Sequence, residues 1–349
     1  MPKPRDRPAE PDRRRVVLGS AAVVVATAVP AAPLAAEVGL APAADLLARA
    51  NQFLSGLEPD QRKAALFAWN GPEWGAWNYF GSSDFIKPGL RLEQMRALQK
   101  GAAWELLATV LSASGLEKAK NVMTLQDVLA ARGDGVGRRS SERFSFAVFG
   151  EPADRGSWGF RLEGHHLSLS IAVRDGRIVA VTPSSFSANP NRVTSGMHSG
   201  LVTLKSEEAL ARRLFSDLAP KLQARARLAD MALRNILSYA GRERANAQKV
   251  GLAAADLAPA QRELLWQIIE TYTVEHLSPT LATAQRARVT SGDREAVHFA
   301  WYGPNTVETA FGYRVIGDGF VIEIGSVDAA AQHLHTVYHD LASVLGRSG

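Results

Sequence analysis

The chain has 349 residues, of which 46% are hydrophobic and 21% are charged. This balance suits a globular protein of one large domain or two smaller ones, and no low-complexity block indicates extended disorder. Cysteine is absent, which excludes disulfides, thiolate metal ligands and cysteine nucleophiles. Residues 1–36 hold six basic and three acidic side chains, which leaves only +2 of the formal charge of +5 for the rest, so we expect no nucleic-acid partner.

The first 36 residues are typical of an export signal. A polar, basic start ends in Arg13-Arg14-Arg15 and is followed by VVLGSAAVVVATAV, an apolar run too short to span a bilayer. Arg14-Arg15 before a hydrophobic pair resembles the twin-arginine signal, and PAAPLAAE has small residues suited to cleavage. We therefore expect a periplasmic or secreted protein that meets the twin-arginine or general export machinery and is not stably inserted in a membrane after cleavage. A membrane anchor is the alternative.

Four segments have apolar residues near the spacing of an amphipathic helix, namely 91–115, 204–218, 223–237 and 258–279. The first and the last each contain a glutamine followed by a tryptophan five residues later, at Gln99/Trp104 and Gln261/Trp266. Both of these predicted helices precede segments that resemble each other.

The two similar segments, 141–171 and 294–324, align without a gap at an offset of 153 residues. Eight of the 31 aligned positions are identical: Glu142/Glu295, Phe146/Phe299, Ala147/Ala300, Gly150/Gly303, Gly159/Gly312, Arg161/Arg314, Gly164/Gly317 and Ile171/Ile324. A register held this long indicates an internal repeat.

Both copies predict an antiparallel meander. FSFAVFG and VHFAWYG are rich in aromatic and β-branched residues and stop at glycine, and LSLSIAV and FVIEIGS are further strands. RDGR at 174–177 predicts a tight hairpin turn. A shorter match, AALFAWNGP at 64–72, is either a third related strand or, as we favour, an aromatic segment that covers the others.

Five of the eight histidines fall in two short clusters, EGHHLSLS with His165 and His166, and AAQHLHTVYHD with His333, His335 and His339. On a strand, neighbouring side chains point to opposite faces, so only one of the first pair could enter a given site. The second cluster could form either a strand or a helix. On a strand His333 and His335 share a face, and on a helix His335 and His339 share a face.

These patterns suggest a metal site. Two imidazoles of the second cluster, His165 or His166, and Glu323 would supply nitrogen and oxygen ligands for a divalent transition metal such as zinc, copper or iron. In a hydrolytic site the metal would lower the pKa of a bound water, and Glu163 or Glu323 would act as base.

Structural roles are the alternative for the same residues. Histidines in a sheet are often satisfied by hydrogen bonds alone, and Glu323, inside the apolar run FVIEIG, could pair with Arg161 or Arg314.

Other chemistry has less support. No nucleophile elbow, phosphate-binding loop or HExxH helix is present. Trp69, Trp74 and Trp77 could form a stacking surface for a small-molecule ligand, although aromatic residues more often pack in a core. Asn189 lies in the long polar loop 184–200, a length typical of a functional loop or a surface crossover.

The segments WGFRLEGHHLSLS, TPSSFSANP and HLHTVYHD together resemble the domain-of-unknown-function 3500 family, over roughly residues 45–345. The resemblance implies an exported or secreted protein without an established activity. The family often has an arginine at the position of His339, so the resemblance implies His333 and His335 as the site residues of that cluster.

We therefore predict an α+β fold in which two repeated units, each of helices followed by an antiparallel meander, share or face one sheet with helices packed on it. The units are expected at 37–203 and 204–349, in one globular domain after a signal peptide at 1–36. Our hypothesis for function is a His/Glu metal site, hydrolytic in character, between the repeats. The alternative is a non-catalytic module that binds a ligand or partner and whose histidines are structural.

Overall fold

The computed structural model describes residues 39–81 and 87–348, so the export signal predicted at 1–36 lies outside the described residues. Within the described part, no helix combines the length and the apolar character that crossing a membrane requires. The described residues belong to one compact unit.

The helices occur in two groups along the chain. They are α1 (Ala44–Ser55), α2 (Pro59–Ala65), α3 (Pro72–Gly75), α4 (Ala97–Ala108), α5 (Ala113–Ala131), α6 (Lys205–Asp217), α7 (Pro220–Ala226), α8 (Pro259–Thr273) and α9 (Pro279–Val289), with 3-10 turns η1 (Leu92–Gln94) and η2 (Ala254–Asp256). The two glutamines of the shared Gln/Trp pattern lie in the first turns of α4 and α8: Gln99 accepts the backbone N–H of Arg96 at 2.8 Å, and Gln261 accepts that of Ala258 at 3.0 Å. Each satisfies an N–H that the first helical turn leaves unpaired.

Two helix predictions need correction. The segment predicted as one helix over 91–115 divides, because Ser112 caps a new helix, α5, by accepting the N–H of Gly115. The helix predicted over 223–237 ends at Ala226, because the chain there turns into a strand beside β11 and then lies against the sheet. Leu233 and Asn235 fill the space that side chains would take at Gly312 and Gly325.

Most of the described strands join in one mixed sheet. They are β1 (Ala41–Pro42), β2 (Leu66–Phe67), β3 (Leu90–Arg91), β4 (Ser145–Phe149), β5 (Ser157–Gly164), β6 (Leu167–Arg174), β7 (Arg177–Ala180), β8 (Ser184–Phe186), β9 (Arg227–Ala229), β10 (Leu252–Ala253), β11 (His298–Tyr302), β12 (Gly312–Ile316), β13 (Phe320–Ser326) and β14 (Leu334–Asp340), with β15 (Ser343–Val344) and β16 (Arg347–Ser348) as a separate hairpin. The order across the sheet is β10-β11-β12-β13-β14-β8-β6-β5-β4-β2. The predicted α+β class is confirmed, and both halves of the chain share the sheet.

The two halves run through similar elements. β4, β5 and β6 form an antiparallel meander, as do β11, β12 and β13, and the strands β4 and β11 differ by the predicted offset of 153 residues. The predicted hairpin turn at 174–177 joins β6 to β7, with positive φ at Asp175 and Gly176. Duplication as the origin of this likeness stays a prediction.

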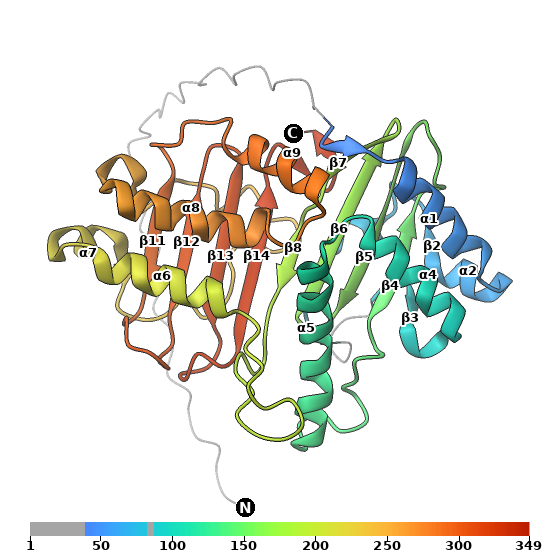
Figure 1. Cartoon of the computed structure of the whole chain (residues 1–349), viewed down its shortest axis with the longest axis horizontal. Coiled ribbons are helices and arrows are strands. Elements are labelled where there is room, and N and C mark those ends of the chain that lie inside the picture. The colour runs from blue at the N-terminus through green and yellow to red at the C-terminus, as the bar shows by residue number, and fades with distance from the viewer. Residues whose placement is uncertain (1–38, 82–86, 349) are drawn as a thin grey trace, which may run out of the picture. The chain divides into compact units, whose positions relative to one another are not determined.

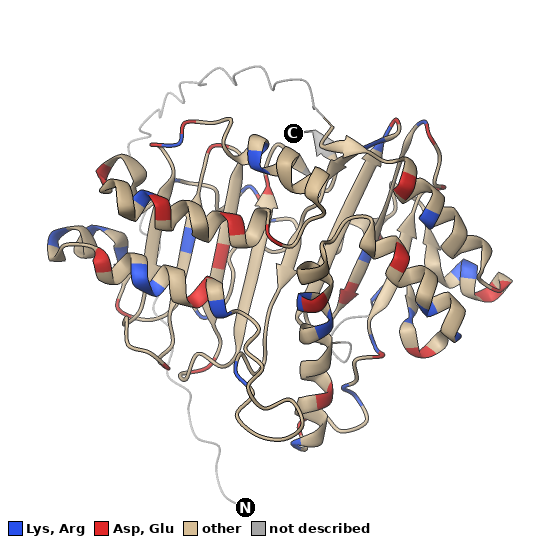
Figure 2. Ribbon diagram, viewed as in Figure 1, with Lys and Arg blue, Asp and Glu red and all other residues tan. Residues whose placement is uncertain are grey.

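The sheet has a different cover on each face. The larger helices lie on one face in both halves (Figure 1). The opposite face is covered by aromatic side chains from the coil after β2, with Ile236 and Leu345 from two other connections. Charged residues colour mainly the helices and connections and leave the strands largely tan (Figure 2).

Two buried arginines are exceptions, and they occupy aligned positions. Arg161 on β5 donates to Ser170 at 2.8 Å on β6, and Arg314 on β12 donates to Glu323 at 2.7 Å on β13. The guanidinium groups also donate to backbone carbonyls of the segments that cover this face, those of Trp74 in the short helix α3 and of Asn246. Each arginine thus ties the coil cover to the sheet.

Glu323 is fully buried, and both of its carboxylate oxygens have partners. One faces Arg314, and the other accepts the backbone N–H groups of Leu237 and Ser238 at 2.8 Å each. We predict that Glu323→Gln lowers the free energy of unfolding by about 3–5 kcal/mol, because it leaves a buried guanidinium without its counter-charge. Urea unfolding measures this. Glu295→Gln, which breaks an exposed pair with Arg262, should cost about 0–1 kcal/mol, and equal costs for the two variants would contradict the prediction.

Candidate metal centre

The two histidine clusters meet where the halves of the sheet join. β8 pairs antiparallel with β6 on one side and with β14 on the other, so β6 and β14 run parallel and begin at the same edge. His166 precedes β6 directly, and His333 precedes β14 directly. The backbone therefore places both clusters at one end of the junction (Figure 1).

His165 and His166 form the two-residue turn between β5 and β6, not a strand as predicted. His166 has φ of 69°, and this left-handed conformation ends the alternation of faces. The two rings consequently lie against each other, with centroids 3.7 Å apart and planes tilted by 31°, in place of pointing to opposite faces. The backbone of His166 is held on both sides, by its N–H to Tyr79 O and by the N–H of Ser187 to its own carbonyl, each at 2.8 Å.

The second cluster resolves as a strand. His335 and His339 belong to β14, and His333 stands just before it, so all three side chains project to the coil-covered face. The backbone just before β14 is held by Asp328, whose Oδ1 accepts the backbone N–H of His333 at 3.1 Å. His339 lies farther along, where its Nε2 donates to Ser238 O at 2.6 Å, and it has no part in the converging group described next.

Three imidazoles converge at this end of the sheet. Nε2 of His333 lies 3.0 Å from Nε2 of His166 and 3.0 Å from Nε2 of His335. Among the described residues these three form a group whose ligand atoms all lie within 4.8 Å of one another. His166 and His335 are buried and His333 is half-buried. Three nitrogens at this spacing could hold one metal ion.

The surroundings keep these rings neutral. Burial lowers the pKa of His335 to about 3, with a smaller contribution from His333. Burial also lowers the pKa of His166 well below 6.5, and it lowers that of His333. A neutral ring retains the lone pair that a metal needs.

One hydrogen bond selects the tautomer of His335. Its Nδ1 lies 2.9 Å from Oδ1 of Asn235, and the Tyr79 hydroxyl donates to the same oxygen at 2.7 Å. An amide oxygen only accepts, so His335 carries its proton on Nδ1 and directs the lone pair of Nε2 at the other two rings. A hydrogen bond of this kind to the second ring nitrogen is usual for metal-binding histidines.

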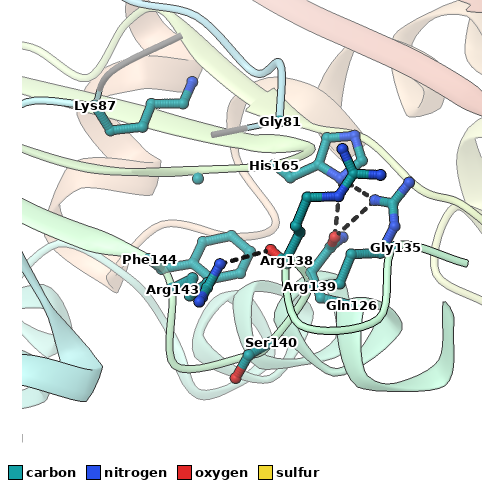
Figure 3. A pocket seen from close by; sticks show the side chains of 11 residues that line it. Gly81, Lys87, Gln126, Gly135, Arg138, Arg139, Ser140, Arg143, Phe144 and His165 are labelled. Carbon is teal, nitrogen blue, oxygen red and sulfur yellow. Dashed lines mark hydrogen bonds between the residues drawn. The ribbon is translucent and has the colours of Figure 1, made fainter. Parts of the chain in front are cut away.

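His165 was predicted as a ligand but lies outside the converging group. Its Nδ1 is 2.6 Å from Nη1 of Arg139 and 2.8 Å from Oε1 of Gln126 (Figure 3). A guanidinium group can only donate, so the hydrogen bond from Arg139 uses the lone pair of Nδ1 of His165. That nitrogen is then not free to bind a metal. Burial and then Arg139 lower the pKa of His165 to about 3.

The predicted carboxylates are engaged elsewhere. Glu323 pairs with Arg314, as described above. Oε1 of Glu163 accepts the backbone N–H of Asn78 at 2.5 Å and the hydroxyl of Ser168 at 3.1 Å, while its Oε2 is buried without a hydrogen bond. Neither belongs to the converging group, which contains nitrogen ligands only.

The predicted ligand-binding residues are largely covered. Trp74 and Trp77 are 0% and 1% exposed, so their faces are closed to a stacking ligand, and Trp69 is half-buried against Trp74. They cover the sheet face opposite the larger helices, as an aromatic covering segment would. Within 64–72 itself, however, Leu66–Phe67 forms the short strand β2, which pairs parallel with β4. Asn189 is half-buried in the connection after β8.

Sequence reasoning missed Asn235, Tyr79 and Arg139. Asn235 falls in a segment predicted as helix, and its role depends on a coil that crosses the sheet from a distant part of the chain. Tyr79 stands in the aromatic run, without a spacing that separates it from its neighbours. No local pattern marks any of the three.

The chain belongs to the family described as protein of unknown function (DUF3500), whose model matches residues 40–343. The resemblance found from the histidine motifs is thus confirmed. Neither the curated proteins nor the solved structures contain a match to this chain.

Acid should weaken the metal-free fold. His165 and His335 have pKa values of about 3 in the fold, below their unfolded value of 6.5, so the unfolded state binds more protons as the pH falls through 6.5. Each such group lowers the free energy of unfolding by up to about 1.4 kcal/mol per pH unit. These two groups alone should cost roughly 3 kcal/mol between pH 6.5 and 5, and the buried His166 and His276 act in the same direction, so we predict a loss of at least that size in urea unfolding of metal-free protein.

The pH dependence of the free energy of unfolding, compared between variants, shows which histidine causes the loss of stability. His335→Asn should flatten the dependence by close to one proton, whereas the same change at exposed His198 should leave it as in the wild type. A His335→Asn slope equal to the wild-type slope would show that this ring does not stay neutral in the fold.

Proposed function

We propose that this protein binds one divalent transition metal ion, zinc, copper or iron, through Nε2 of His166, His333 and His335, and that the metal centre serves hydrolysis. The observation that carries the proposal is the pair of 3.0 Å contacts at Nε2 of His333.

Hydrogen bonding alone cannot satisfy both contacts. A ring nitrogen carries at most one hydrogen, so Nε2 of His333 can direct a proton at one neighbour only. Nε2 of His335 has none to give, because the proton of that ring is on Nδ1 facing Asn235. If His166 donates to His333, two lone pairs face each other between His333 and His335. One cation between the rings would satisfy all three nitrogens.

The spacing suits a small tetrahedral ion. With metal–nitrogen bonds of about 2.0–2.1 Å, ligand nitrogens lie about 3.3 Å apart, close to the 3.0 Å that separates His333 from each of the other two. The third pair, His166 and His335, lies within 4.8 Å, so these two rings would move closer together around the ion. Three protein ligands leave a further position for water, which is the pattern of catalytic and not structural zinc. A metal there supplies a water of lowered pKa as nucleophile. The expected export of the chain would put this centre in the periplasm or outside the cell.

Metal content tests the proposal. Protein purified without a His-tag should contain about one transition-metal ion per chain by elemental analysis, because all three ligands come from one chain. His333→Ala/His335→Ala should lose the metal and keep its circular dichroism spectrum. His198→Ala, at an exposed histidine, should keep the metal. A folded wild-type protein that holds no metal and whose melting temperature does not respond to added zinc, copper or iron would refute the proposal and favour structural histidines.

Asn235 should act through His335 and not as a ligand. We predict that Asn235→Ala weakens metal binding about 10–100-fold, since the ring loses the acceptor that sets its tautomer. Asn235→Asp, which retains an acceptor, should recover much of that affinity. Competition with a chromophoric chelator measures both. Equal losses in the two variants would indicate a general effect on the coil.

A further inference from the structure

A cavity of about 120 Å³ lies beside the candidate metal centre. His165 forms part of its wall and packs against the candidate metal ligand His166, with ring centroids 3.7 Å apart. One residue of the cavity wall is therefore in direct contact with a candidate metal ligand. Figure 3 shows the side chains that line it.

The lining is basic and contains no acidic side chain among the described residues. Its cations are Lys87, Arg138, Arg139 and Arg143. The ion pairs of these cations in the described structure are with residues that do not line the cavity: Asp134, 3.2 Å from Arg139, and Glu93, 3.4 Å from Arg143. The exposed Arg138 has no carboxylate partner in the described structure.

Two buried donors at the wall have no acceptor. Gln126 is 2% exposed, and its Nε2 makes no hydrogen bond; Nε of Arg139 makes none either. Lys87 is 7% exposed and donates to Asn78 O at 2.6 Å, so a third nearly buried donor group adjoins the same space. Donors that are buried without acceptors are costly unless a ligand completes them.

We propose that this cavity binds an oxyanion, the carboxylate or phosphate group of a small-molecule substrate. Such a group supplies several acceptor oxygens for the buried donors and a negatively charged partner for Arg138. Guanidinium groups bind oxyanions through paired hydrogen bonds. The assignment of this anion to a substrate rests on the proposed metal function, because an anion held here would put the rest of the molecule near the metal. The binding of an anion in the cavity does not depend on the metal function.

The test uses inorganic phosphate and acetate as separate probes. Each is titrated calorimetrically into metal-free and metal-loaded wild-type protein at constant ionic strength maintained with sodium chloride. We expect saturable binding of at least one probe to both forms. Arg138→Gln/Arg143→Gln should weaken it at least about tenfold, the effect of losing one charge-assisted hydrogen bond or more. Phosphate alone, acetate alone or both would tell which oxyanion the cavity prefers.

Arg132→Gln/Arg155→Gln is the matched control. It removes the same two charges from exposed positions outside the cavity and should bind the probe as the wild type does. Arg138→Gln alone serves if the double variant misfolds, and should still weaken binding.

Three results would overturn the proposal: no saturable binding of either probe, equal weakening in the control, or binding only when metal is loaded, which would place the anion on the metal. Binding to a wild-type protein that takes up no metal would support the cavity and refute only the metal function.

Discussion

The pairing of β8 with β6 on one side and with β14 on the other is the interaction on which the rest of the structure depends. It is short, since β8 has three residues, but it makes one sheet from two halves that are each complete meanders. Because both neighbours are antiparallel to β8, they begin at the same edge, and residues 167 sequence positions apart come within hydrogen-bonding distance at His166 and His333. The converging group of three histidines therefore draws on both halves.

Covering the sheet with large helices on one face only has a second consequence. The other face needs apolar cover, and coil segments rich in tryptophan supply it. A coil carries backbone groups that must be paired, so buried side chains such as Arg161 and Glu323 reach out of the sheet to hold it. The same coils bring Tyr79 and Asn235 to His335. The residues that orient the candidate ligand are thus part of the cover.

The features that local sequence patterns predicted correctly are those that depend on residues close together in the chain. The strands of both meanders, most of the helix predicted over 258–279 and the hairpin at 174–177 follow from period and turn chemistry. The turn at His165 and His166 was missed, because EGHHLSLS alternates as a continuing strand would and lacks the glycine or asparagine usual at a left-handed position. The histidine motifs marked the right region, but which rings converge depends on pairing across β8, which no local pattern encodes.

Glu323 shows why the sequence pattern suggested a ligand that the structure uses elsewhere. A carboxylate in an apolar run needs a partner, and the sequence offered both a metal and an arginine; the cross-strand register of β12 and β13 decides for Arg314. The converging group is consequently all nitrogen, and neutral ligands do not offset the charge of a divalent ion. A 2+ ion in a largely buried place, beside a cavity lined by further cations, would need an anion nearby. The all-nitrogen group and the basic cavity thus support the two proposals together, since an anion in the cavity would offset the charge of an ion held by the three histidines.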